Sequence, residues 1–267
     1  APQAPASPSS ISQQAQPNQA KPEYAFEESL PRIGVEGYVG SQSCVKCHQD
    51  EHASWHRTYH RTMTQVASTN SIQGDFKNVI LTNGNTRFTL TQKTNEYCVR
   101  MEPISGEGVG LGVETGIGLI SGSHHMHVFW VPEGTGNLQI GFPFTWLIPE
   151  KRWVPRNSTF IRPPDFEPRP EARNIICSRC HSTGLEPHFD AAARTVQTQV
   201  GELGISCEAC HGPAKRHVEL RTAQLSTAAP KLEPGEIVHP EKLTAERSAQ
   251  TCGFCHSMKW IDHSENW

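Results

Sequence analysis

The chain has 267 residues, of which 36% are hydrophobic, and it carries a net charge of −3 with a mean hydropathy of −0.52. This near-neutral balance gives no basis for binding nucleic acid or an anionic membrane surface. No apolar run reaches the roughly eighteen residues of a bilayer-spanning helix, so we predict no transmembrane segment, and the low apolar fraction predicts a thin core if side chains alone build it.

The N-terminal extension, residues 1–35, is rich in Pro, Gln, Ala and Ser, a composition typical of linkers and disordered segments. Such a segment has little tendency to order alone, so we expect it either to lie against a neighbouring subunit or to pack on its own domain. The sequence starts at Ala1 with neither an initiator Met nor an apolar signal segment, which is the pattern that a cleaved signal peptide leaves. We therefore predict an exported protein.

Four pentads of the pattern Cys-x-x-Cys-His follow, and they take eight of the nine cysteines. This is the spacing of c-type haem attachment, in which two thiols bind one porphyrin and the adjacent histidine binds its iron. A zinc ribbon needs no histidine after the second cysteine, and a disulfide framework suits a much shorter chain. We predict four covalently attached c-type haems, with Cys44, Cys47, Cys177, Cys180, Cys207, Cys210, Cys252 and Cys255 as attachment residues and His48, His181, His211 and His256 as proximal iron ligands.

The extension and three further parts make up the chain. Residues 36–70 form a first haem-binding segment, with a helical pattern over 40–66. Residues 71–170 form a β and loop lobe, in which residues 78–100 alternate as strands around a hairpin turn at Asn83-Gly84. Residues 171–267 form a three-haem helical segment.

The expected fold is a multihaem cytochrome c, made mainly of short helices and irregular loops around a haem chain, with a small β-hairpin or β lobe. Helices are expected over residues 191–200 and 214–225. Cys98, the ninth cysteine, has no thiol left to pair with in the chain, and we expect it to serve as a small buried hydrophobic residue in a strand.

The sixth iron ligand decides the chemistry, because a six-coordinate haem passes electrons whereas an open position can bind a substrate. His60 lies twelve residues after His48 on a predicted helix, and a helix of that length rises about 18 Å, so His60 is expected to bind the iron of another haem. His124 and His125 point to opposite faces if the chain is extended there. Either one of them is a ligand, or both bind different irons.

His217 follows His211 by only six residues, too few to wrap around the same haem. We therefore assign it to an adjacent haem, most simply the one held by Cys177 and Cys180. The remaining candidates that would complete the set are His239 and His263.

Several stretches around the pentads resemble multihaem cytochromes c related to the cytochrome c554 family, common among exported bacterial proteins. They are residues 38–60, 122–130, 153–156 and 204–218, so the resemblance covers about residues 38–258. It implies electron transfer through closely spaced, mostly bis-histidine haems. By motif position it supports His60, one of His124 and His125, and His217 as distal ligands, and it implies a polar rather than a ligating role for His239.

Electron transfer without catalysis is the leading functional hypothesis, in a periplasmic or extracellular location and with redox proteins as partners. The chain would act as a free shuttle, as a subunit of a larger redox complex, or as the repeating unit of a filament (a nanowire). The alternative is a multihaem reductase or oxidase that acts on small nitrogen or sulfur compounds at one five-coordinate haem.

Overall fold

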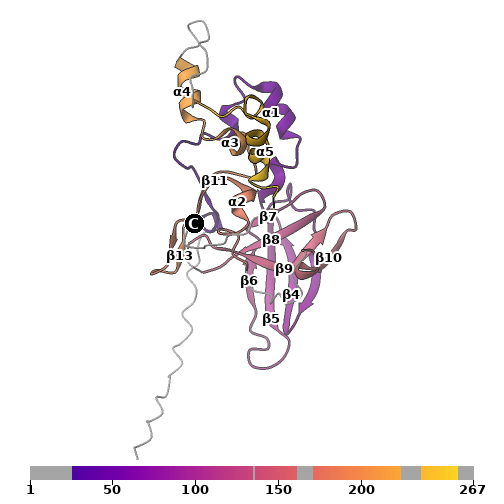
Figure 1. The fold of residues 1–267 in the computed structure, drawn as a ribbon. Coiled ribbons are helices and arrows are strands. Elements are labelled where there is room, and N and C mark those ends of the chain that lie inside the picture. The colour runs from indigo at the N-terminus through magenta and orange to yellow at the C-terminus, as the bar shows by residue number, and fades with distance from the viewer. Residues whose placement is uncertain (1–25, 135, 161–170, 224–235, 258–267) are drawn as a thin grey trace, which may run out of the picture.

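The computed structural model describes residues 26–134, 136–160, 171–223 and 236–257. Figure 1 shows two ends of the molecule: helices α1, α3, α4 and α5 gather at one, and the long strands gather at the other. The helices are α1 (Gln49–His56), α2 (Ser178–His181), α3 (Cys207–His211), α4 (Lys215–Ala223) and α5 (Ala245–Gly253), with 3₁₀ turns at Phe26–Ser29, Ser41–Ser43, Arg61–Met63, Arg156–Ser158 and Pro240–Lys242.

The strands of the described residues form four sheets. One has the order β10-β9-β8-β7-β2, with β2 Thr64–Val66, β7 Leu119–Ser121, β8 Met126–Pro132, β9 Gln139–Leu147 and β10 Arg152–Pro155. A second has the order β3-β4-β5-β6, with β3 Lys77–Asn83, β4 Thr86–Lys93, β5 Glu96–Pro103 and β6 Val113–Gly116. A third sheet has the order β1-β14-β11, with β1 Arg32–Ile33, β14 Gln199–Leu203 and β11 Ser182–Glu186. The fourth pairs β12 (Phe189–Asp190) with β13 (Thr195–Val196).

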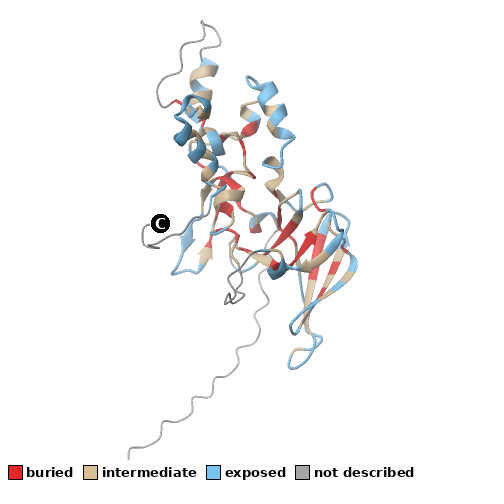
Figure 2. Ribbon diagram, turned by 45° about the vertical axis from the view of Figure 1, so that its right-hand side comes forward, coloured by how far each residue is buried: buried red, intermediate tan, exposed pale blue. Residues whose placement is uncertain are grey.

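The main core lies between the five-stranded and the four-stranded sheets. Phe88, Leu90 and Val99 of the four-stranded sheet pack with Phe129 and Phe142 of the five-stranded sheet. Burial of large aromatic side chains between two sheets is the usual stabilisation of a β-sandwich. Figure 2 shows the buried residues concentrated in the sheets.

Strand β8 is buried on both of its faces. Phe129 and Val131 point into the sandwich core, whereas Val128 and Trp130 belong to a second cluster that includes Leu119. Successive residues of a strand point to opposite faces, so an unbroken apolar run requires cover on both sides. The second face of β8 is covered by the part of the chain that carries the pentads, because Cys177 and Leu203 pack on this cluster.

A buried network of amide and hydroxyl groups positions the approach to the second pentad. Asn137 donates from Nδ2 to the Thr198 carbonyl (2.9 Å) and accepts from the Thr198 amide at Oδ1 (2.8 Å). Asn174 donates to the Asn137 carbonyl (3.0 Å) and accepts from the Gln139 amide (2.8 Å). Because each of these buried groups is paired, the network fixes residues 137, 174 and 198 relative to one another.

The helical end has few buried side chains of its own. Helices α1, α4 and α5 contain no buried residue. None of the described helices is both long enough and apolar enough to cross a membrane. Short helices without a buried face gain little from packing against protein alone.

The predicted fold class is wrong, because strands and not helices dominate the described residues. Residues 113–155, expected to be a small β and loop lobe, contain five strands rich in aromatic and β-branched residues, which favour a pleated, half-buried surface. The helix expected over residues 191–200 is also absent. Asp190 accepts hydrogen bonds from the amides of Ala192 and Ala193 (both 2.9 Å), and this turn joins β12 to β13.

Two local predictions are confirmed. Strands β3 and β4 pair in antiparallel register around Gly84, whose φ of 57° is the left-handed conformation that this hairpin turn requires. Helix α4 occupies the described part of the helix predicted over residues 214–225. Of the N-terminal extension predicted over residues 1–35, residues 1–25 lie outside the described residues, whereas β1 pairs in parallel with β14 of the same chain. His263 also lies outside the described residues.

Replacing Phe129 by Ala tests the sandwich core. Its side chain is fully buried, so we expect the free energy of unfolding to fall by about 3–5 kcal/mol. The matched control is Phe189→Ala in β12, where the side chain is 58% exposed and we expect a loss below about 0.5 kcal/mol. Chemical denaturation followed by far-ultraviolet circular dichroism measures both, and equal losses would contradict this description of the core.

Candidate haem sites

Each pentad forms a single helical turn. The amide of the pentad histidine donates to the carbonyl of the first cysteine at 2.9 Å in the first and fourth pentads and at 3.0 Å in the second. The third pentad coincides with helix α3. A helical turn places residues three and four apart on the same face, so the two thiols and the imidazole of a pentad project to one side.

Glu208, inside the third pentad, anchors the backbone that leads into the first pentad. Its buried carboxylate accepts hydrogen bonds from the amides of Gly40 (2.8 Å), Val39 (3.1 Å) and Ala214 (2.8 Å). Glu202 adds two more from Ser41, whose amide lies at 2.8 Å and whose hydroxyl lies at 2.6 Å. Hydrogen bonds to an ionised acceptor are stronger than neutral ones, so these two carboxylates hold the first pentad against the third.

A second attachment holds the far end of the first haem-binding segment. Trp55 donates from Nε1 to the Ile205 carbonyl (2.8 Å), and the Ile205 amide donates to the His60 carbonyl (3.0 Å). Gly204 has a φ of 78°, and a Cβ there would lie 2.4 Å from the Arg61 carbonyl oxygen. Only glycine permits this close approach of the two backbones.

The thiols of different pentads lie close together. Cys44 and Cys207 interact directly, and this side-chain hydrogen bond raises the pKa of Cys44 and lowers that of Cys207. The Cys255 sulfur lies 4.0 Å from the Cys180 carbonyl oxygen. Burial, and then the neighbouring Cys252, raise the pKa of Cys210. In space the pentads therefore follow the order first, third, fourth, second.

Three pentad histidines each face a second histidine ring. The ring centroids are 6.2 Å apart for His48 and His217, 6.1 Å for His256 and His60, and 6.5 Å for His211 and His239. Two imidazoles on opposite sides of one iron have centroids about 6 Å apart, because a metal–nitrogen bond is about 2 Å long and a ring nitrogen lies about 1.1 Å from its centroid. The residues of these three sites therefore fit a six-coordinate haem c.

Hydrogen bonds at Nδ1 orient two of these rings. His217 donates to the buried carboxylate of Glu236 (2.7 Å), which is also paired with Arg221 (2.6 Å). His211 donates to the Val238 carbonyl (2.8 Å). A carboxylate and a carbonyl only accept, so each ring carries its proton on Nδ1 and keeps the Nε2 lone pair for a metal.

The second pentad lies beside the turn that carries His124 and His125. Thr64 donates from its hydroxyl to the His181 carbonyl (2.5 Å), and in the strand register Thr64 pairs with Ser121, just before that turn. The two histidine rings of the turn are 4.0 Å apart. Burial, and then the neighbouring Arg173 cation, lower the pKa of His181, so its imidazole is neutral at pH 7, the form that binds a metal.

The placements differ in part from the sequence-based assignments. The His60 ring lies at the fourth pentad and not at its own, as expected, although the helix on which that expectation relied is shorter than predicted and ends at His56. His217 lies at the first pentad and not, as assigned, at the second, because α4 runs back from the third pentad toward His48. The resemblance gave His239 a polar role, yet its ring faces His211. One local feature is consistent with this position of His239. The residue before it, Val238, accepts a hydrogen bond from His211 through its carbonyl, so the Val238-His239-Pro240 segment lies beside that ring.

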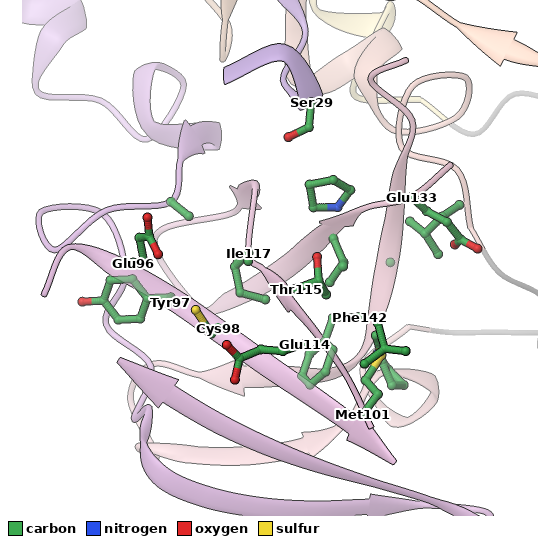
Figure 3. Close-up of a pocket in the computed structure, with 18 of the residues that line it drawn as sticks. Ser29, Glu96, Tyr97, Cys98, Met101, Glu114, Thr115, Ile117, Glu133 and Phe142 are labelled. Carbon is green, nitrogen blue, oxygen red and sulfur yellow. The ribbon is translucent and has the colours of Figure 1, made fainter. Parts of the chain in front are cut away.

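The ninth cysteine lies in the sandwich, away from the pentads. Cys98 in β5 is buried, as predicted, and burial raises the pKa of its thiol. It lines a hollow of about 1180 Å³ beside β5 and β6, together with Glu96, Tyr97 and Glu114 (Figure 3). None of the candidate iron ligands lines this hollow.

Comparison with known families and structures gives the following matches. Residues 157–212 match the family model described as cytochrome c554 and c-prime, a stretch that contains the second and third pentads. The predicted resemblance to this family is thereby confirmed. No curated protein sequence matches the chain.

Two solved structures match the chain. The crystal structure of the outer cell wall cytochrome OcwA is 19% identical with a TM-score of 0.49, covering 83% of this chain and 37% of that one. The undecahaem cytochrome from the S-layer of Carboxydothermus ferrireducens is 17% identical with a TM-score of 0.47, covering 85% of this chain and 26% of that one. The chain thus spans well under half the length of either protein.

Replacing Glu208 by Gln tests the attachment of the first pentad to the third. The amide keeps one acceptor oxygen but loses the charge, so we expect the free energy of unfolding to fall by about 2 kcal/mol. Glu219→Gln on the exposed face of α4 is the matched control, with an expected change within about 0.5 kcal/mol. Urea denaturation of the haem-loaded protein measures both. An unchanged free energy of unfolding in Glu208→Gln would show that this attachment does not depend on the charge of Glu208.

Proposed function

We propose that the chain, which resembles cytochrome c554 over residues 157–212, carries four haem c groups and transfers electrons without transforming a substrate. The observation that carries the proposal is the facing of pentad and non-pentad histidine rings at 6.1–6.5 Å in three separate places. A haem c bound at such a site takes up and releases one electron at its iron.

The proposed attachment residues are the eight pentad cysteines. Six of their thiols, those of Cys44, Cys207, Cys210, Cys252, Cys255 and Cys180, lie close to a residue of another pentad, as described above. Porphyrins bound through them would cover helices α1 and α5, which contain no buried residue. Apolar plates of this kind supply the burial that the helical end does not obtain from side chains.

The proposed distal ligands are His217 for the first pentad, His239 for the third and His60 for the fourth. For the second pentad, one of His124 and His125 is proposed, because Thr64 connects His181 to the strand pair that leads into their turn. With every iron held by two histidines, no position stays open for a substrate, which favours an electron carrier over the reductase or oxidase alternative.

The proximity of the pentads supports a single electron path. Cys44 interacts with Cys207, Cys252 is near enough to Cys210 to raise its pKa, and the Cys255 sulfur lies beside the Cys180 carbonyl, which supports the order first, third, fourth, second for the proposed haems. Electrons would enter and leave at the ends of this order through redox partner proteins. The exposed pentad cysteines are Cys47, Cys210 and Cys252, so of the two end sites the first has an exposed attachment residue.

An exported, periplasmic or extracellular location is part of the proposal, because haem c is attached outside the cytoplasmic membrane. Assembly into a filament or a larger redox complex stays a prediction from the sequence. It was based on the N-terminal extension, residues 1–35, of which residues 1–25 lie outside the described residues.

The variant His239→Ala tests the proposed ligation. We expect it to retain four haems per chain but to convert one of them from low-spin to high-spin, so that about a quarter of the low-spin signal is lost and cyanide binds. His188→Ala is the matched control, because His188 is exposed and pairs with Glu186 (2.9 Å) away from the pentads. Haem content and electron paramagnetic resonance of the ferric protein measure both. An unchanged His239→Ala spectrum, or fewer than four haems in the unaltered protein, would contradict the proposal.

A further inference from the structure

Arg173 is a fully buried cation beside the second pentad. Its guanidinium donates to the hydroxyls of Ser178 (2.7 Å), Thr64 (2.8 Å) and Ser182 (3.1 Å) and to the His181 carbonyl (3.2 Å). These acceptors are all neutral oxygens, and Nε has no hydrogen-bond partner among the described residues. A buried charge is ordinarily paired with an opposite charge, so this arrangement calls for an explanation.

Arg173 carries its positive charge at neutral pH, because a guanidinium keeps its proton in proteins. Its backbone is part of the second pentad's own turn, because its carbonyl accepts from the amides of Cys177 (3.1 Å) and Ser178 (3.0 Å). The cation is therefore fixed relative to the pentad from both its side chain and its main chain.

The first and third pentads have the opposite electrostatic environment. There the buried Glu208 carboxylate is held by backbone amides, and Glu202 is held by Ser41. At the first pentad's distal histidine, Glu236 is paired with Arg221. The second pentad thus has a buried, unpaired cation, whereas the first and third have a buried carboxylate satisfied by dipoles alone.

We propose that Arg173 tunes the second haem site, raising the reduction potential of the iron bound by His181. This inference rests on the proposed function, since it requires a haem at Cys177 and Cys180. Reduction by one electron, supplied by a redox partner protein, converts ferric to ferrous iron and lowers the charge of the site by one. A fixed positive charge nearby in a poorly screened interior disfavours the more positive ferric state, so it shifts the balance toward the ferrous state.

The consequence is a direction along the path. The second pentad is at one end of the spatial order of the four sites, and the first pentad is at the other. A cation at the second pentad and carboxylates at the first and third make the second site the preferred resting place of an electron. Arg173 acts through the potential of the iron and touches no substrate, so it is a positioning residue in this account.

Four variants of the full-length, haem-loaded protein test the proposal. Arg173→Met removes the charge, and Ser178→Asp keeps the arginine but places a carboxylate where the Ser178 hydroxyl lies 2.7 Å from it. Arg173→Lys keeps the charge with altered geometry, and Ser178→Ala removes a hydrogen bond and keeps the charge. The readouts are haem content per chain and an optical redox titration resolved into one-electron components.

We expect Arg173→Met and Ser178→Asp to lower the ferrous-to-ferric ratio of one component at least tenfold at a given applied potential, which is a shift of about 59 mV. Arg173→Lys and Ser178→Ala should change that ratio less than threefold. Equal shifts in Ser178→Ala and Arg173→Met, or no shift in the two charge-neutralised variants, would overturn the proposal.

Failure of the proposed function and failure of the proposed role of Arg173 give different results. If Arg173→Met does not fold, Ser178→Asp decides the matter, because it retains the buried guanidinium and its other hydrogen bonds. If the unaltered protein lacks haem at the second pentad, the proposed function fails. If all four haems are present and the potentials of all variants agree, only the role of Arg173 fails.

Discussion

The close approach of the first pentad to the third depends on the buried carboxylate of Glu208. Its bonds to Val39 and Gly40 connect two parts of the chain that are more than 160 residues apart in sequence, and its bond to Ala214 fixes the residues just after the third pentad. A carboxylate in this position costs desolvation, which the surrounding backbone amides offset. The contact between Cys44 and Cys207 and the facing of His48 and His217 both follow from this attachment.

The β-sandwich, whose strands lie between the first and second pentads in the sequence, supports the pentads through strand β8. Strand β8 presents Phe129 to the sandwich and Trp130 to the pentad side, so one strand belongs to both cores. The Trp130 indole donates to the Ser121 hydroxyl (2.9 Å), and the Arg156 guanidinium lies 4.5 Å above its ring. These contacts fix the end of the five-stranded sheet from which the turn with His124 and His125 emerges.

The sequence predicted the attachment motifs and one hairpin, but not the amount of sheet. A pentad is a local pattern, and so is the Asn83-Gly84 turn, so both are visible without tertiary contacts. The strands β7 to β10 contain glycine, proline and aromatic residues without simple alternation, because β8 is buried on both faces. Ala191 to Ala193 have a high helix propensity, but the side chain of Asp190 closes a turn there instead.

Pairing of histidines is likewise a tertiary property. His60 was assigned to another haem from the rise of a helix reaching residue 60, but α1 ends at His56, so the placement agrees with the prediction whereas its premise was wrong. Assigning His217 to the second pentad failed, since nothing in the local sequence reports the direction in which α4 runs back. His239 lies 28 residues after His211, and its proximity to that ring arises only when the intervening segment returns to α3.

The central claim is that each of three irons would lie between the pentad histidine and a histidine from a distant segment. An experimental density map of the haem-loaded protein at side-chain resolution tests it most directly. The account predicts His217 opposite His48, His239 opposite His211 and His60 opposite His256, each bound to iron. Water or an empty sixth position at any of these irons, facing a polar pocket, would contradict it and favour a catalytic haem.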